Sequence, residues 1–75
     1  MPLIAPRIAV ERDVQSGKPL IEGTRVPVSV VVGAVAAGDS IEEVAREYAI
    51  TPHDVRAALS YAAKLVEDEA VRAPR

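Results

Sequence analysis

The segment of residues 17–28 constrains the fold more than any other part of this chain, because it places two glycines and two prolines around a short apolar stretch. Glycine adopts backbone angles that other residues resist, whereas proline fixes φ and removes an N–H donor. Together they restrict the backbone to one path through the segment. Such a path is typical of a fixed junction between two structural elements, and not of a flexible spacer.

Two short strands are predicted around this junction. Residues 7–12 alternate apolar and polar side chains, which predicts a half-buried strand whose inner face carries Ile8 and Val10. Residues 19–22 are the expected partner strand, and the stretch between the two is rich in turn-forming residues. A small hairpin or a pair of β-arms is therefore expected within residues 7–25. Two strands alone are not stable in water, so this arm must lie on helices or pair with the arm of a second subunit.

Residues 26–38 carry no charge and are rich in valine, so local preference is ambiguous between strand and helix. We favour a helix over residues 27–37, because Pro27 suits a first helical turn and Gly38 suits the position just after a helix end. Gly33 weakens this helix by ~1 kcal/mol relative to alanine, which favours close approach of another backbone there. The uncharged run is shorter than the ~20 residues that a membrane-spanning helix requires.

Capping residues mark the starts of two further helices. Ser40 and Glu43 form a capping box, which predicts a helix over residues 41–48. Thr51 is the expected cap of a last helix over residues 52–71. The apolar positions predicted to form the inner stripes of these two helices are Ile41, Val44, Ala45, Tyr48, Val55, Ala58, Leu59, Ala62 and Val66.

The predicted fold is therefore mainly α, with a small N-terminal β-arm followed by three helices, in a single domain over residues 1–75. A chain this short buries only ~60% of its unfolded surface. Its only aromatic residues are Tyr48 and Tyr61, and it has no cysteine, so neither large buried rings nor disulfides supply the missing stability. Self-association is the remaining route, and we expect a homodimer.

Charge and the start of the chain limit the function classes. The formal net charge is −2, with +1 in residues 1–38 and −3 in residues 39–75. Proteins that bind through phosphate contacts usually show a plainer positive excess, so nucleic-acid binding would require a dimer that concentrates a few arginines. The first seven residues lack a charged leader followed by a long apolar run, so we expect a cytoplasmic protein without membrane contact.

The helix over residues 41–48, the connection over residues 49–51 and the helix that begins at Pro52 match a helix-turn-helix in spacing and polarity. In that motif the start of the second helix enters the major groove of DNA. The alternative is a helical hairpin that only closes the core, and Asp54 at the same helix start would repel phosphates. The candidate DNA-binding residues are Arg46, for a phosphate, and His53, Arg56, Ala57 and Ser60.

Catalysis has little support in the sequence. His53 is the only histidine, so no metal-binding pair exists, and the acidic residues over 41–48 are typical of a solvated helix face. We expect no enzyme activity, no metal, no cofactor and no small-molecule substrate. Lys18 and Arg25 are candidates for an anion site with the Gly23 backbone, although we favour a role in bridging the loop to carboxylates or carbonyls.

A distinctive set of loop residues gives the chain a family resemblance, and it comprises Gly17, Lys18, Pro19, Ile21, Gly23, Thr24, Arg25 and Pro27. The apolar helix ending at residues 37–38, the start at residues 40–43 and the stretch over 54–62 extend the same pattern. Together these residues resemble the family called domain of unknown function 433, from Ile8 to about Ala63. Family members often carry a proline after the position of Tyr48, where this chain has Ala49 and Ile50.

That family is treated as VapB-type antitoxin-like. The resemblance implies a homeodomain-like helix-turn-helix, homodimerisation through the β-arm loop and the first helix, and gene pairing with PIN-like ribonuclease toxins. The expected function is an antitoxin that neutralises such a toxin and represses its own operon. The alternative is a homodimeric structural or protein-interaction module, or a stand-alone transcriptional regulator, without a toxin partner. The candidate toxin-binding residues supply an apolar edge and cations for an acidic active site, and they are Leu65, Val66, Val71, Arg72 and Arg75.

Overall fold

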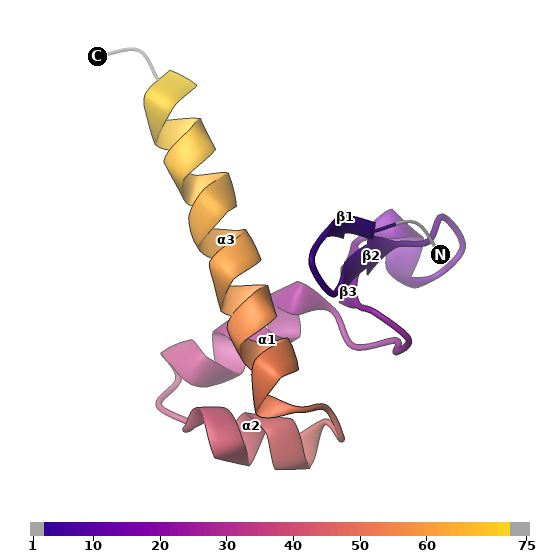
Figure 1. Ribbon diagram of the computed structural model, residues 1–75, viewed down its shortest axis with the longest axis vertical. Helices are drawn as coiled ribbons and strands as arrows, with labels where there is room; N and C mark the ends of the chain where they lie inside the picture. The colour runs from indigo at the N-terminus through magenta and orange to yellow at the C-terminus, as the bar shows by residue number, and fades with distance from the viewer. Residues whose placement is uncertain (1–2, 73–75) are drawn as a thin grey trace.

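A computed structural model describes the backbone of residues 3–72 and the side chains of residues 3–69 (Figure 1). A three-stranded sheet is followed by three helices, so the chain is a small, mainly helical domain with an N-terminal β-arm, as the sequence predicts. The elements are β1 Leu3–Ala5, β2 Ile8–Val10, a 3-10 turn Gln15–Gly17, β3 Pro19–Ile21, α1 Val28–Ala36, α2 Ile41–Glu47 and α3 Pro52–Arg72.

The sheet is antiparallel, with the strand order β1-β2-β3. Ile8 pairs with Ile21, and Ala9 pairs with Leu20. All four side chains are fully buried, so both faces of β2 are covered. The predicted alternation is therefore wrong in part, because Ala9 is buried and Val10 is only half-buried. The sequence also missed β1, because its three residues show no apolar and polar alternation.

The glycine and proline segment forms a tight connection from β3 to α1. The N–H of Thr24 and its hydroxyl both donate to the Ile21 carbonyl, at 3.0 Å and 2.8 Å. The Thr24 hydroxyl in turn accepts from the Val26 N–H at 3.0 Å, and Gly23 has the positive φ of 77° that the turn requires. The prediction of a fixed junction is confirmed by this network.

The valine-rich segment is a helix, as predicted, and it ends where Gly38 adopts a φ of 112°. The Asp39 N–H donates to the Ala34 carbonyl at 3.2 Å, which satisfies one of the free carbonyls at the helix end. Gly33 is exposed, and a Cβ built there would meet nothing within 4 Å. No other segment within the described chain therefore makes the close approach expected at Gly33.

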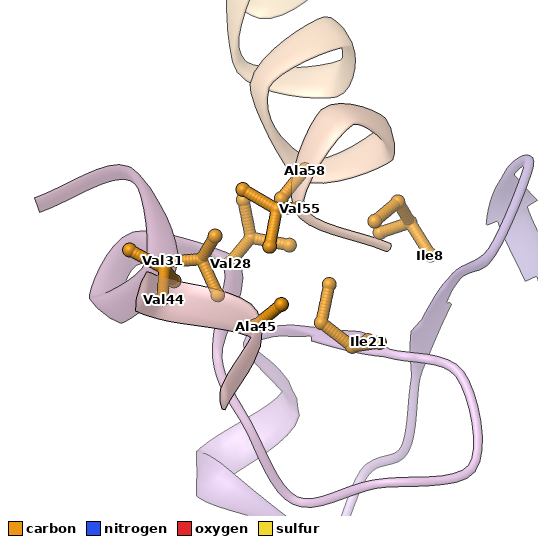
Figure 2. Close-up of a cluster of buried hydrophobic side chains, with 8 residues drawn as sticks. All are labelled: Ile8, Ile21, Val28, Val31, Val44, Ala45, Val55 and Ala58. Atoms are coloured by element: carbon orange, nitrogen blue, oxygen red, sulfur yellow. The ribbon is translucent and has the colours of Figure 1, made fainter. Parts of the chain in front are cut away.

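The core joins the sheet to all three helices (Figure 2). Its buried members are Ile8, Ile21, Val28, Val31, Val44, Ala45, Val55 and Ala58. On α3 the buried positions end at Ala58, and the side chains from residue 63 to residue 69 are all exposed. Figure 1 shows this half of the helix projecting away from the other helices. Val66 is therefore not part of the core, contrary to the prediction.

Candidate interaction surfaces on helix α3

The first turn of α3 is held by a reciprocal cap and an ion pair. The Asp54 N–H donates to the Thr51 hydroxyl at 3.0 Å, and the Thr51 N–H donates to Asp54 Oδ2 at 3.1 Å. The other carboxylate oxygen, Oδ1, accepts a hydrogen bond from the Arg7 guanidinium. Arg7 lies in the turn between β1 and β2, so this ion pair ties the sheet to the start of α3.

Asp54 remains ionised although its residue is only 4% exposed. Burial raises the pKa of a carboxyl group, but the hydrogen bonds from Arg7 and Thr51 outweigh it and hold the pKa of Asp54 below its ordinary value. The same hydrogen bond raises the pKa of Arg7. The charge of Asp54 is thus matched by a cation and turned away from solvent, which weakens the objection that it would repel phosphates.

The connection between α2 and α3 is a tight turn. Ala49 has a φ of 56°, in the left-handed region that disfavours residues with a Cβ, and the next N–H, of Ile50, donates to the Ala45 carbonyl at 2.9 Å. This is a common way for a helix to end, and it sets α3 against α2 without a proline. Where members of the resembled family often carry a proline, this chain therefore has a left-handed cap at Ala49.

A groove of about 810 Å³ runs between the start of the sheet and α3. One wall is formed by Ile4, Ala5 and Pro6 of β1 and the turn after it. The other wall is a single face of α3, formed by His53, Arg56, Ala57, Ser60, Tyr61, Lys64, Leu65 and Asp68. The groove therefore has a mixed lining, in which apolar side chains lie beside three basic ones and the acidic Asp68 on the α3 wall.

Four of the five candidate DNA-binding residues line this groove. His53, Arg56 and Ser60 are exposed, and Ala57 is half-buried. The fifth candidate, Arg46, is exposed near the end of α2 and is not among the lining residues. The sequence assigned these residues to the start of the second helix of the motif, but it gave no sign that β1 lies beside them.

A second hollow, of about 530 Å³, lies between α1 and α3 beside the start of the glycine and proline segment. Lys18 and Pro19 line it together with Val32, Gly33 and Tyr61. Arg25 is exposed and does not line it. Among residues 3–69, Arg7 and Asp54 form the only ion pair, so neither Lys18 nor Arg25 has the carboxylate partner that we favoured.

The projecting half of α3 exposes apolar side chains. Leu65 is 49% exposed and Val66 is 64% exposed, on a helix whose neighbouring positions Glu67, Asp68 and Glu69 are acidic. The other three candidate toxin-binding side chains, of Val71, Arg72 and Arg75, lie outside the residues whose side chains the structure describes. The exposed part of the candidate partner surface is therefore Leu65 and Val66.

No group of three or more His, Asp or Glu side chains in a metal-binding arrangement occurs among the described residues. None of the helices there is long and apolar enough to cross a membrane.

Comparison with known proteins identifies related sequences and folds. Residues 8–62 match the family model described as "Protein of unknown function (DUF433)". Among solved structures, the chain is similar to the X-ray crystal structure of Rv2018 from Mycobacterium tuberculosis, with 33% sequence identity and a TM-score of 0.65. That match covers 69% of this chain and 24% of the Rv2018 chain, so it spans about a quarter of that protein. No curated protein matches the chain.

Proposed function

Because the chain belongs to the family of proteins of unknown function called DUF433, we propose that it acts as the antitoxin-like component of a toxin-antitoxin pair. In this role it binds and neutralises a PIN-like ribonuclease toxin. The proposal rests on the resemblance stated from the sequence and on one structural observation. That observation is the projecting half of α3, on which Leu65 is 49% exposed and Val66 is 64% exposed.

An exposed amphipathic helix is a common way to bind a protein partner, because its apolar face enters a groove on the partner. Monomeric proteins seldom leave neighbouring large apolar side chains uncovered unless the surface has a use. Leu65 and Val66 are adjacent, and each is about half exposed or more. The acidic residues that follow, at positions 67–69, place negative charge next to this apolar surface.

Operon repression is the second part of the proposal. Arg46, His53 and Arg56 are exposed on the two helices of the helix-turn-helix, and the pairing of Asp54 with Arg7 removes an unmatched negative charge from the start of α3. A homodimer would set two such helices at a half-site spacing on DNA. Binding of this kind must weaken steeply with added salt, because phosphate contacts release counterions.

A non-catalytic role fits the same features. The only histidine, His53, lines an open groove, and no metal-binding group of acidic or histidine side chains accompanies it within the described residues. We propose that the chain has no enzyme activity and needs no cofactor. The alternative function is a homodimeric interaction module, or a stand-alone regulator, that has no toxin partner.

The proposal predicts that a PIN-like ribonuclease is encoded next to this gene, and it is tested with that nuclease. The purified nuclease is titrated with the full chain, and RNA cleavage is measured. We expect stoichiometric loss of cleavage with the wild type. We expect at least ~10-fold weaker inhibition with Val66→Asp, since a charge then replaces an apolar contact at a hot-spot position. Glu42→Gln, at an exposed residue of α2 that lines neither hollow, is the matched surface control and should inhibit as the wild type does.

Two results would overturn the proposal. One is an adjacent nuclease that keeps full activity at a large excess of this chain. The other is the absence of any nuclease gene beside it, which favours the stand-alone regulator. For the DNA part, binding to its own promoter that is no tighter than binding to random duplex would remove operon repression.

A further inference from the structure

Lys18, in the glycine and proline segment, has no acidic partner in the part of the chain that the structure describes. The only ion pair among residues 3–69 joins Arg7 to Asp54. Lys18 is exposed and lines the second hollow, between α1 and α3. The segment that carries the family resemblance therefore supplies this hollow with a cation that the fold itself does not use.

The backbone on both sides of Lys18 is fixed. The three residues before it, Gln15, Ser16 and Gly17, have positive φ values of 52°, 58° and 78°, in the left-handed region that residues with a Cβ resist. The Lys18 N–H donates to the Gln15 carbonyl at 3.1 Å, and Pro19 begins strand β3. Strained backbone of this kind clusters at ligand-binding positions and persists only where the surrounding structure holds it. Lys18 is therefore held at the hollow before any ligand arrives.

The rest of the hollow is apolar or carries a hydroxyl group. It lies where α1 packs against α3, and Figure 1 shows the two helices crossing there. The lining residues other than Lys18 are Pro19, Val28, Ser29, Val32, Gly33, Tyr61, Ala62 and Leu65. Lys18 is the only charged residue of this lining, which contains no carboxylate. The volume of about 530 Å³ lies within the range of roughly 300–1,000 Å³ that is typical of small-molecule sites.

We propose that the second hollow binds a small carboxylic acid with an apolar body. The carboxylate pairs with Lys18, and the apolar body lies against Val28, Val32 and Tyr61. A single lysine matches the one negative charge of a carboxylate. A phosphate monoester carries about 1.5 to 2 negative charges at neutral pH, so part of its charge would lie unmatched beside apolar walls. The acid is bound and not converted, so this inference goes beyond the proposed function and does not depend on it.

Gly33 keeps one side of the hollow open. It lies in α1 and lines the hollow, and a Cβ built there would meet nothing within 4 Å. A larger side chain at this position therefore enters free space and does not displace the core. Leucine is also a better helix former than glycine, so Gly33→Leu should fill the hollow and keep the fold.

The proposal is tested by titrating the isotope-labelled full chain with octanoate and following the amide chemical shifts by NMR. We expect saturable shifts around the hollow, at residue 18 and within residues 28–33 and 61–65. Acetate has the carboxylate without the apolar body, and it should give no saturable shift. Octylammonium has the same apolar chain with the opposite charge, and it should bind at least ~5-fold more weakly than octanoate. Octyl phosphate should bind no more tightly than octanoate.

Two variants test the charge and the space separately. Lys18→Gln should weaken octanoate binding roughly fivefold and remove the preference over octylammonium, whereas Arg25→Gln, at an exposed residue that does not line the hollow, should change neither. Gly33→Leu should abolish the shifts, whereas Ala36→Leu, at an exposed position of α1 outside the lining, should leave them in place. Neither Lys18 nor Gly33 is a candidate DNA-binding or toxin-binding residue, so a failure here leaves the proposed function untouched.

Four outcomes would overturn the inference. The first is the absence of saturable shifts with octanoate, and the second is binding of octylammonium as tight as that of octanoate, which shows that the charge is not selected. The third is octanoate binding that Lys18→Gln and Gly33→Leu both leave unchanged, which places the acid elsewhere on the surface. The fourth is tighter binding of octyl phosphate, which contradicts the choice of a carboxylate. Unchanged amide shifts far from the hollow confirm that each variant is folded.

Discussion

Arg7 and Asp54 are 47 positions apart in the sequence, yet the Arg7 guanidinium donates a hydrogen bond to the Asp54 carboxylate. The pair joins the turn after β1 to the first turn of α3. Because β1 forms one wall of the α3 groove, this contact ties that wall to the start of α3. A contact that stabilises the fold therefore also shapes the surface on which the proposed partners bind.

The first prediction concerns the ion pair. Asp54→Ala should lower the free energy of unfolding by about 1–2 kcal/mol, because it removes the helix cap with Thr51 as well as the partner of Arg7. Arg7→Ala should also destabilise the protein, since it leaves a buried carboxylate without its cation. In the double variant the two losses should not add, as measured by urea unfolding.

Arg12→Ala is the matched control for Arg7→Ala, because Arg12 is exposed in the loop after β2. It should leave the unfolding midpoint within experimental error. Strictly additive losses for Arg7→Ala and Asp54→Ala would show that the two side chains do not interact in solution.

The second prediction concerns pH. The pKa of Asp54 lies below its ordinary value of 3.8, so the unfolded chain binds more protons than the folded chain at acid pH. The stability that this carboxylate contributes is present above about pH 4 and is lost as the pH falls through the lower pKa of the folded state. The free energy of unfolding should therefore decrease from about pH 5 to pH 2.

Asp54→Asn should flatten this decrease. The pKa of Glu43 is also lowered, mainly by its hydrogen bond from the Ser40 N–H, so Glu43→Gln removes a separate part of the same slope. If Asp54→Asn shows the same acid dependence as the wild type, Asp54 is not paired in the way described.

The third prediction concerns the turn between α2 and α3. Ala49 has a positive φ, which costs about 1 kcal/mol for a residue with a Cβ. Ala49→Gly should therefore stabilise the protein by up to ~1 kcal/mol, as measured by thermal unfolding. Ala63→Gly, in the exposed interior of α3, is the matched control and should destabilise it by a similar amount. A loss of stability at both sites would contradict the left-handed cap at Ala49.

The fourth prediction concerns the sheet. Ile8 is fully buried in the core cluster, so Ile8→Ala should cost about 2–5 kcal/mol. Val10 is only half-buried, and Val10→Ala should cost clearly less. Because Ile8→Ala could unfold so small a domain, Ile8→Val, at about 0.5–1.5 kcal/mol, keeps the comparison measurable. A cost for Val10→Ala of about 2 kcal/mol or more, as for a fully buried side chain, would favour the strand face predicted from the alternation.

The sequence predicted what local chemistry determines. The Ser40 and Thr51 caps fix the starts of α2 and α3, and each hydroxyl accepts the expected N–H at 3.0 Å. The prediction of a helix for the valine-rich segment is also confirmed. This helix lies between Pro27 and Gly38, the two residues that were expected to mark its ends. These features depend on residues within a few positions of one another.

Long-range relationships could not be predicted in the same way. β1 forms by pairing with β2, and its own three residues carry no periodic signal. The Arg7 contact with Asp54 requires the turn after β1 to lie on the start of α3, which no local pattern encodes. The stripe of apolar residues on α3 was expected to remain in the core as far as Val66, but the other elements cover it only over the first half of the helix.

The central claim is that the projecting half of α3 binds a protein partner. It is tested most directly by amide hydrogen exchange of residues 62–69, with and without the PIN-like ribonuclease that the proposal predicts to be encoded beside the gene. The side chains of this part of α3 are exposed from residue 63 to residue 69, so these amides should exchange quickly in the free protein and become strongly protected in the complex. Unchanged exchange over residues 62–69, with protection appearing only elsewhere, would contradict the account.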